Sequence, residues 1–394
     1  MKIAGIIAEY NPFHNGHAWH IAETRRLTGC QYVVVCMDGH FTQRGEAAVL
    51  SKWDRAACAL RCGADAVFEL PALFAIRSAD AFARGGVGVL GGLGVDALSF
   101  GSELMDLSLI EKLADIHKKE PTSVSNDVRE GLSAGMSHAR AWGEAVSRYL
   151  GIPAEALNSP NLILAAEYVR AIRESFPDIE PLAIQRRGGY HDDALGTFAS
   201  ASAIRGAFDR GDIDAALACL PEAARMTPDS MHPMDDLLLY RLREMSPEAL
   251  AALPDMSEGL EHRLYRACRA AATREGLLEM LKCKRYTHAR LSRMLTHAAL
   301  GMTREMTDTY PAPTYARLLG ARRDAEPLLR ELKRRARIPL VSNPGRLRDD
   351  PVFQLECRAT DLWALLHDDP ERRLSGREYT EKFIRIYKEL SQNA

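Results

Sequence analysis

An α/β fold, with a doubly wound parallel sheet followed by a mostly helical domain, is the fold class that the sequence predicts. Over the first two hundred residues, short β-rich runs alternate with helical stretches, which is the pattern of βαβ units and of a parallel sheet covered on both faces. After about residue 212 the β-rich runs nearly vanish, and Leu-, Ala- and Arg-rich segments with helical periodicity follow. We therefore predict an α/β domain over residues 1–212 and a mostly α-helical domain over residues 213–394.

The elements of the α/β domain follow from the order of these runs. Strands are predicted at residues 3–9, 31–37, 65–70 and 95–100, with helices beginning near Asn15, Lys52 and Ala79. Ser159 and Pro160 mark a further helix start, because a capping hydroxyl precedes a proline at the first helical position. Another strand ends at Arg186, and the Ser-rich start of residues 200–205 indicates a helix N-terminus. Ligands of such sheets bind at the carboxyl ends of the strands, which here are residues 9–17, 38–44 and 101–103.

The composition is that of a globular protein without a strong overall charge. The chain has 394 residues, enough for two domains, and 46% hydrophobic residues, enough for sizeable cores. Its formal net charge of −2 creates no whole-chain attraction to nucleic acid, so local clusters of basic residues must decide that question. No apolar run reaches the ~18 residues of a membrane span, and Glu9 and Asn11 interrupt the first apolar run, so we expect a cytoplasmic protein.

The cysteines carry no sign of a metal site. They are scattered along the chain without a CxxC pair, and several lie inside apolar runs where a thiol acts as a small hydrophobe. The closest pair, Cys58 and Cys62, has i,i+4 helical spacing and no second pair of ligands nearby. Buried structural thiols are favoured over zinc, and we predict no metal site.

Residues 11–17, Asn-Pro-Phe-His-Asn-Gly-His, carry the strongest chemical signal. They follow the first predicted strand and open the first helix, where backbone N–H groups and the helix dipole favour a phosphate. Gly16 permits close approach of a ligand to the backbone, and His14 and His17 are placed to donate hydrogen bonds to a triphosphate whose leaving pyrophosphate gathers charge. Two histidines near a helix start are also compatible with capping groups or a partial metal site.

This segment resembles the HxGH signature of the nucleotidyltransferase superfamily, which includes the class I aminoacyl-tRNA synthetases. Residues 200–205, Ser-Ala-Ser-Ala-Ile-Arg, resemble the second signature of that superfamily, and the two occur in the expected order. A narrower resemblance, over most of the chain, is to the bacterial tRNA(Met) cytidine acetate ligase family. It rests on the blocks AEYNPFHNGH, FTQRGEAAVLSKWDRA, FELP, FGSE, SPNLILAAEY, IQRRGGYHD, SASAIR and KRYTHARLSRML.

The resemblance implies a fold, an activity and substrates. Residues 1–212 are expected to form a Rossmann-like nucleotidyltransferase domain that binds ATP and carries out catalysis, and residues 213–394 a tRNA-binding domain. Family members activate acetate with ATP, giving acetyladenylate and pyrophosphate, and transfer the acetyl group to the N4 amine of the wobble cytidine of elongator tRNA(Met). ATP with Mg²⁺, acetate and elongator tRNA(Met) are therefore the expected ligands. Two alternatives stay open, a small-molecule nucleotidyltransferase and an RNA-binding protein that has lost catalysis.

The resemblance also carries the family's nucleotide contacts onto this sequence. The sequence shortens the loop after the contacting arginine, so two candidates remain, and register favours Arg186 over Arg187. Asp38 and His40 depart from the family's usual Ser-Gly-Asn-Phe, which affects the adjacent pocket rather than the reaction class. The implied contacts are Ile7, Ala8, Glu9, Tyr10, Asn11, Pro12, Phe13, His14, Asn15, Gly16, His17, Ala18, Trp19, His20, Gly101, Asn161, Arg186 and Arg187.

The residues predicted to be catalytic are His14, His17, Lys52 and Arg205. The histidines are expected to stabilise phosphate charge as acetate attacks the α-phosphorus, and Arg205 is expected to clamp the β- or γ-phosphate. Lys52 and Arg44, on either side of Glu46, are predicted to hold acetate or a tRNA phosphate; an ion-paired loop and helix start is the alternative.

Two carboxylates near the predicted strand ends carry weaker signals. Asp38 is a candidate for removing a proton from the attacking amine, although a helix cap or a turn explains an aspartate there equally well. For Glu103, an acidic residue in the first turn of a helix is an equally simple explanation.

Two basic stretches of the helical domain are candidates for tRNA contact, because basic residues spaced along helices can line a surface that binds the phosphate backbone. A solvated helical face is the alternative for both. The first stretch, with Tyr286 and His288 interleaved, comprises Lys282, Lys284, Arg285, Arg290 and Arg293, and the second comprises Arg330, Lys333, Arg334, Arg335 and Arg337.

Overall fold

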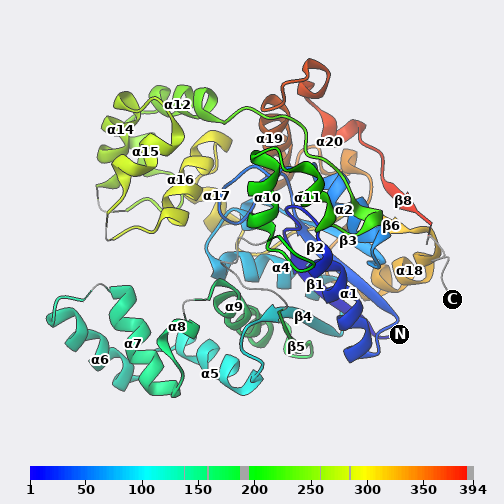
Figure 1. The fold of residues 1–394 in the computed structure, drawn as a ribbon, viewed down its shortest axis with the longest axis horizontal. Coiled ribbons are helices and arrows are strands. Elements are labelled where there is room, and N and C mark those ends of the chain that lie inside the picture. Colours follow the sequence, from blue (N-terminus) through cyan, green and yellow to red (C-terminus); the bar gives the residue numbers. More distant parts are fainter. Residues whose placement is uncertain (137, 158, 187–194, 258, 284, 388–394) are drawn as a thin grey trace.

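A single sheet runs through the centre of the molecule in the computed structural model (Figure 1), which describes residues 1–394 except 137, 158, 187–194, 258, 284 and 388–394. The strand order is β5-β4-β1-β2-β3-β6-β7, with β8 pairing with β6. The strands are β1 (Ile3–Ala8), β2 (Tyr32–Asp38), β3 (Ala66–Leu70), β4 (Ala97–Ser102), β5 (Glu180–Gln185), β6 (Ala316–Arg322), β7 (Leu340–Val341) and β8 (Ile384–Ile386).

The first five strands form the parallel, doubly wound sheet that the sequence predicts. β1 pairs in parallel with β2 on one side and with β4 on the other, so the direction of winding reverses beside β1. β3 extends the sheet beyond β2, and β5 extends it beyond β4, again in parallel. In such a sheet the carboxyl ends of the strands diverge at the reversal point and leave a crevice for a ligand.

Helices cover both faces of this sheet because alternate strand residues point to opposite sides. Val33 of β2 packs in a cluster with Ile21 of α1, whereas the next residue, Val34, belongs to the cluster that includes Leu90 of α4. The helices of the sheet region are α1 (Asn15–Thr28), α2 (Lys52–Arg61), α3 (Ala72–Ala75), α4 (Ala79–Leu93), α9 (Pro160–Ser175), α18 (Glu326–Arg335), α19 (Pro351–Leu365) and α20 (Arg377–Thr380).

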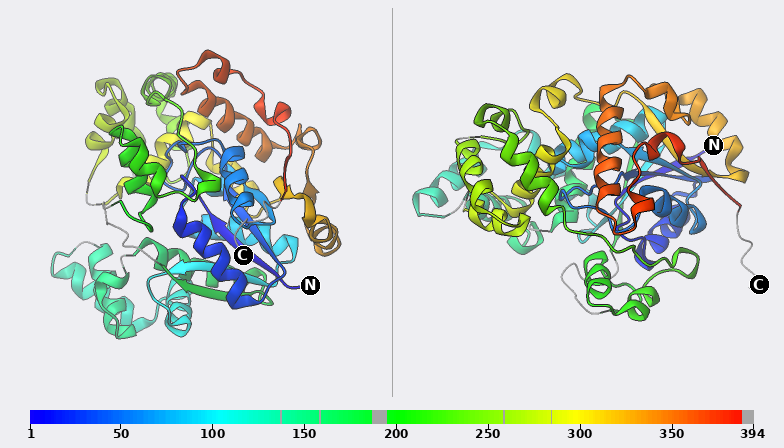
Figure 2. Two further views of the ribbon diagram at one scale, coloured as in Figure 1. Left: turned by 45° about the vertical axis from the view of Figure 1, so that its right-hand side comes forward. Right: turned by 90° about the horizontal axis from the view of Figure 1, so that it is seen from above.

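Two groups of helices project from the same side of the sheet region, at the lower left and upper left of Figure 1. The lower group is α5 (Leu107–Lys118), α6 (Thr122–Ser133), α7 (His138–Leu150) and α8 (Ala154–Leu157). The upper group is α12 (Asp235–Glu244), α13 (Pro247–Ala251), α14 (Leu260–Ala270), α15 (Arg274–Leu281), α16 (His288–Leu300) and α17 (Arg304–Thr309). A third pair, α10 (Ala201–Asp209) and α11 (Ile213–Ala218), stands out at the lower edge of the right-hand view in Figure 2. Short 3₁₀ turns lie at Glu222–Ala224, Arg323–Ala325, Pro344–Leu347 and Pro370–Arg373. Among the helices described, none combines the length and the apolar character needed to cross a membrane.

The chain after residue 212 is mostly helical, but it also completes the sheet. β6 pairs antiparallel with β3, matching Phe68 with Leu318, and β7 and β8 pair with β6. Residues 316–386 therefore contribute strands to the same sheet as β1–β5, which the sequence pattern does not indicate. The division of the chain into two domains at residue 212 stays a prediction, because one sheet contains strands from both sides of that boundary.

A fully buried cluster of charges joins these distant segments. Lys52 of α2 forms ion pairs with Glu69 of β3 and, at 2.5 Å, with Glu378 of α20. Arg317 of β6 pairs with the same two carboxylates, at 2.8 Å for Glu69. The side chains of Lys52, Glu69 and Glu378 are 0% exposed. Two cations are therefore shared by two carboxylates, and the cluster ties α20 to β3 and β6.

Lys52→Met is expected to lower the free energy of unfolding by about 3–5 kcal/mol, because removing one partner of a buried pair leaves a poorly compensated charge. The matched control is Lys2→Met. Lys2 pairs with Glu180 at 3.3 Å on the surface, and loss of an exposed pair costs at most about 1 kcal/mol. Urea unfolding followed by tryptophan fluorescence measures both variants, and equal losses would contradict the importance of the buried cluster.

Candidate active site

The turn between β1 and α1 ends in a histidine that caps the helix. Nδ1 of His14 accepts a hydrogen bond from the N–H of Gly16 at 3.1 Å, and Nδ1 of His17 accepts one from the N–H of His14 at 3.2 Å. Tyr10 and Phe13, both 1% exposed, form the apolar underside of the turn. The histidines are thus capping groups, as one alternative proposed, and both also line the cavity described below.

The capping bonds decide which ring nitrogens carry protons. Because backbone N–H groups donate to Nδ1 of both rings, each neutral ring carries its proton on Nε2. Burial, with a smaller contribution from the guanidinium of Arg186, lowers the pKa of His14 to about 3. Burial, together with His14, Arg186 and His20, holds the pKa of His17 well below its ordinary value. The stacked rings, 3.7 Å apart at their centroids, therefore present two neutral Nε2–H donors.

A cavity of about 300 Å³ lies where the carboxyl ends of β1 and β4 diverge. The predicted nucleotide contacts that line it are Ile7, Ala8, Glu9, Tyr10, Asn11, His14, Gly16, His17, Trp19, His20, Gly101, Asn161 and Arg186. Pro12, Phe13, Asn15 and Ala18 belong to the same turn and helix but do not line the cavity, and Arg187 lies outside the described residues. Sequence reasoning missed the apolar wall formed by Phe82, Phe100, Leu164 and Tyr168, because apolar residues in helices and strands look like ordinary core.

Residues of the second signature line the same cavity. Ser200 caps α10 by accepting a hydrogen bond from the N–H of Ala203 at 3.1 Å, so this helix also directs its N-terminus to the cavity. Arg205 lines the cavity and donates from Nη1 to the backbone oxygen of Asn11 at 2.7 Å. Two helix N-termini, two Nε2–H donors and a guanidinium therefore converge, which is an arrangement that binds phosphate.

A third wall of the cavity comes from β4, β5 and α9. A Cβ atom on Gly101 would lie 3.1 Å from Cγ of Arg186, so glycine allows this arginine to cross the end of β4. Glu103 accepts a hydrogen bond from Nδ2 of Asn161 at 2.6 Å and another from the hydroxyl of Ser159. Glu103 is not a first-turn acid, because α5 begins only after its cap at Asp106. Its role is to hold the start of α9 at the cavity.

The turn that carries Arg44 and Glu46 forms the mouth of the cavity, and α16 holds it. Ser292 donates to the backbone oxygen of Arg44 at 2.5 Å, and Thr296 donates to that of Gly45 at 2.6 Å. Gly45 has a φ of 74°, and a Cβ atom there would lie 2.9 Å from the α16 backbone. The upper helical group, through α16, therefore determines where the mouth of the cavity lies.

Lys52 is not part of this cavity, and its predicted catalytic role is corrected. Its ammonium is fully buried between Glu69 and Glu378, so it has no free face for acetate or for a tRNA phosphate. The alternative of an ion-paired helix start is the one that the structure supports. The sequence could not reveal this, because Glu378 is 326 residues away along the chain.

Asp38 is likewise not among the residues that line the cavity, which removes its predicted role in proton transfer. It is 0% exposed and accepts a hydrogen bond from Nη1 of Arg55 at 2.7 Å. His40 is equally buried, with Nδ1 at 3.0 Å from the hydroxyl of Thr360. Arg55, which sequence reasoning did not single out, also donates to the backbone oxygen of Glu9. It thereby fixes the ends of β1 and β2 relative to each other.

The structure changes the prediction for both basic stretches. In the first, Arg293 is 8% exposed and Arg290 donates to the backbone oxygen of Asp255 at 2.6 Å, so these two stabilise the helical group. Lys282 and Arg285 are exposed, and Lys284 lies outside the described residues. In the second, on α18, Arg335 binds the backbone oxygen of Met1 and the carboxylate of Asp96, at the amino ends of β1 and β4. That edge is opposite the cavity.

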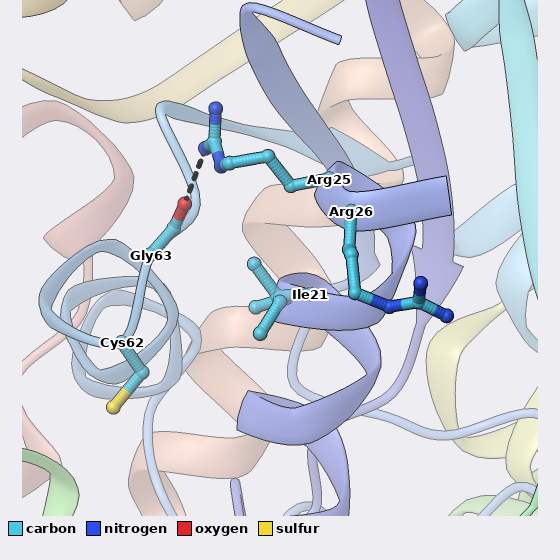
Figure 3. A pocket seen from close by; sticks show the side chains of 6 residues that line it. Ile21, Arg25, Arg26, Cys62 and Gly63 are labelled. Atoms are coloured by element: carbon cyan, nitrogen blue, oxygen red, sulfur yellow. Dashed lines mark hydrogen bonds between the residues drawn. The ribbon is translucent and has the colours of Figure 1, made fainter. Parts of the chain in front are cut away.

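A second hollow, of about 360 Å³, lies away from these groups, between α1 and the end of α2 (Figure 3). Arg25 crosses it to donate to the backbone oxygen of Gly63 at 3.0 Å, and the apolar side chain of Ile21 lies at its floor. It contains no member of either signature segment. We assign it no role.

Comparison with known proteins identifies the family. Residues 1–378 match the model described as HIGH Nucleotidyl Transferase. The tRNA(Met) cytidine acetate ligase of Acetivibrio thermocellus is 36% identical over 417 residues, which cover 98% of this chain and 100% of that protein. Its counterpart in Caldanaerobacter subterraneus is 34% identical over 386 residues, covering 93% and 96%. The chain belongs to the tRNA(Met) cytidine acetate ligase family.

Solved structures agree with this membership. Thermotoga maritima TmcAL in apo form I superposes with a TM-score of 0.89, and form II of that protein, bound with alpha-thio ATP, with a TM-score of 0.88. Both are 30% identical to this chain, and the match covers 98% of this chain and 100% of theirs. The resemblance seen in the sequence and the predicted fold class are confirmed.

The contribution of His14 to stability is expected to fall as the pH drops below 6.5, because His14 is neutral in the folded state and binds a proton on unfolding. Its folded pKa of about 3 lies below the unfolded value, so the loss runs from pH 6.5 towards 3. His14→Asn keeps an acceptor for the cap and removes this titration. Urea unfolding at several pH values between 5 and 7 should show a slope reduced by up to about 1.4 kcal/mol per pH unit in the variant. Equal slopes would show that His14 is not held neutral.

Proposed function

We propose that this protein is an ATP-dependent tRNA(Met) cytidine acetate ligase, which activates acetate and acetylates the N4 amine of the wobble cytidine of elongator tRNA(Met). The observation that carries the proposal is the meeting of the two signature segments at one cavity, joined by the bond from Arg205 to Asn11. The relatives named above carry this activity in their names. Because tRNA and ATP are its substrates, we place the activity in the cytoplasm.

In the first step, a carboxylate oxygen of acetate attacks the α-phosphorus of ATP, and the bond from this phosphorus to the bridging oxygen breaks. Pyrophosphate leaves with the bonding electrons, so negative charge grows on the phosphate oxygens. The Nε2–H groups of His14 and His17 donate hydrogen bonds to these oxygens, and Arg205 binds the β- or γ-phosphate. Neutral donors suit this step, because they are fixed by the helix cap and need no proton transfer.

The remaining nucleotide contacts follow from the walls of the cavity. Arg186, directly after β5, and Asn161, in the first turn of α9, present polar groups to the cavity. Gly101 leaves room for the ligand beside β4. Magnesium is the expected companion of the triphosphate. The described residues contain no cluster of three or more histidine, cysteine or acidic side chains that could hold a metal. The phosphate oxygens and water would therefore supply most of its ligands.

For tRNA, we propose contact through exposed cations near the cavity mouth and on the upper helical group. Arg44 is exposed at the mouth, and Lys282 and Arg285 are exposed beyond α15. Lys282 forms an exposed pair with Glu279, at 3.2 Å, which a phosphate can replace. Arg290 and Arg293 are not proposed as tRNA contacts, because their guanidinium groups contact Asp255 of the same helical group.

The decisive experiment measures both half-reactions. We expect acetate-dependent exchange of radiolabelled pyrophosphate into ATP, and ATP-dependent transfer of labelled acetate to acid-precipitable tRNA. His17→Asn, which keeps an acceptor for the cap but lacks the Nε2–H donor, should reduce exchange about 10²–10³-fold while the melting temperature changes little. Exchange that requires a phosphorylated metabolite in place of acetate, with no label transferred to tRNA, would favour a small-molecule nucleotidyltransferase. Binding of tRNA without consumption of ATP would favour an inactive RNA-binding protein.

A further inference from the structure

Acetyl transfer requires a group that accepts a proton from the attacking amine. Few of the residues that line the cavity can act as this base. This inference rests on the proposed function. The histidines are unsuitable. Nδ1 of His14 and of His17 is occupied by a backbone N–H, and His20, whose Nε2 lies 2.9 Å from the hydroxyl of Ser99, is a weak base because burial lowers its pKa to about 4. Burial raises the pKa of Tyr168 above its ordinary value, so its hydroxyl keeps its proton at neutral pH. Two carboxylates among the cavity-lining residues remain, those of Glu9 and Glu46.

Glu9 lines the cavity and is held in place by two hydrogen bonds. It directly follows β1 and precedes the turn to His14, and it lines the cavity together with residues of both signature segments and of the turn at the mouth. Its backbone oxygen accepts from Arg55, and its Oε1 accepts from the N–H of Gln43 at 2.9 Å. Within the described part of the chain, no hydrogen bond to its Oε2 is seen. One oxygen therefore anchors the side chain, and the other is left to accept a proton.

Glu46 is less suited because it lies on the turn at the mouth. Burial lowers the pKa of Arg274, and the nearby Glu46 carboxylate opposes that shift, which places Glu46 beside this cation. Burial, the largest influence, raises the pKa of Glu9. The charged and titratable groups that face Glu9 are Arg205 of α10, Arg44 and Glu46 of the mouth, Asp38 of β2 and Tyr168 of α9.

We propose that Glu9 is the general base of the acetyl transfer, accepting through Oε2 the proton that the cytidine N4 amine loses. The amine nitrogen attacks the carbonyl carbon of acetyladenylate, forming the amide C–N bond. The bond from that carbon to the phosphate oxygen breaks, and AMP leaves with the bonding electrons. The proton moves from nitrogen to the carboxylate and then to solvent, so no further reactant is needed.

Glu9→Gln separates this role from a merely structural one. The amide oxygen still accepts from the N–H of Gln43, so the mouth stays in place, but the side chain can no longer take a proton. Single-turnover transfer from preformed acetyladenylate to tRNA should fall roughly 100-fold or more, a loss typical for a general base. Acetate-dependent pyrophosphate exchange should fall far less, because the first step has no proton to remove.

The pH profile gives the second readout. In the wild type, transfer should decline as the pH falls through the raised pKa of Glu9, because only the carboxylate accepts a proton. Glu9→Gln should lack this acidic limb. Glu46→Gln, the matched control, should keep it at nearly the same pH, and Glu9→Asp should retain the limb with a lower rate.

Equal losses of transfer and exchange in Glu9→Gln, or an acidic limb that persists in this variant, would overturn the assignment. Loss of the acidic limb in Glu46→Gln alone would transfer the role to Glu46. Failure of the proposed function is distinguishable, because the wild type itself would then show neither acetate-dependent exchange nor acetyl transfer.

Discussion

The reciprocal bonds between two histidines and the first turn of α1 are the interaction on which the site depends. They satisfy backbone N–H groups that would otherwise be unpaired at the helix start, and they fix both imidazoles in the form that donates from Nε2. Gly16 is part of this arrangement, because a Cβ atom there would lie 2.9 Å from Cε1 of His14 and would displace the ring. The HxGH pattern is therefore a structural requirement as much as a chemical one.

The positions of these Nε2–H donors also depend on a fixed arrangement of the ends of β1 and β2. Arg55 accomplishes this by donating to backbone oxygens that follow both strands and to the carboxylate of Asp38. A guanidinium suits the position because its planar donors reach several acceptors at once, and its burial is compensated by that paired carboxylate. Asp38 thus contributes to the cavity by securing Arg55, although it does not line the cavity itself.

Much of the fold was predictable because local patterns agree with the final structure. The strands β1–β4, the helix starts at Asn15 and Lys52, and the caps at His14 and Ser200 all follow from short stretches of sequence. β6 was not predictable, since ARLLGAR lacks the alternation of a strand and contains Arg317, which is buried only because Glu69 and Glu378 surround it. The charge and the two carboxylates that compensate it lie far apart in the sequence.

The same reason explains which site residues could be predicted. His14, His17 and Arg205 belong to contiguous motifs, and the structure brings them to one cavity. Lys52 and Arg293 resemble ligand-binding cations in the sequence, but partners distant along the chain bury them. Burial of a cation depends on tertiary contacts, so no local pattern distinguishes the two cases.

The part of the chain after residue 212 supports the cavity by two separate routes. One is the hydrogen bonding of Ser292 and Thr296 to the turn that forms the mouth, which sets the position of Arg44. The other is the ion pairing of Glu378 with Lys52, which anchors α2, the helix that carries Arg55. Both routes end at residues that touch the cavity or hold Glu9 in place. The first route starts from α16 of the upper helical group and the second from α20 beside the sheet, so two separate segments after residue 212 determine the geometry of the cavity.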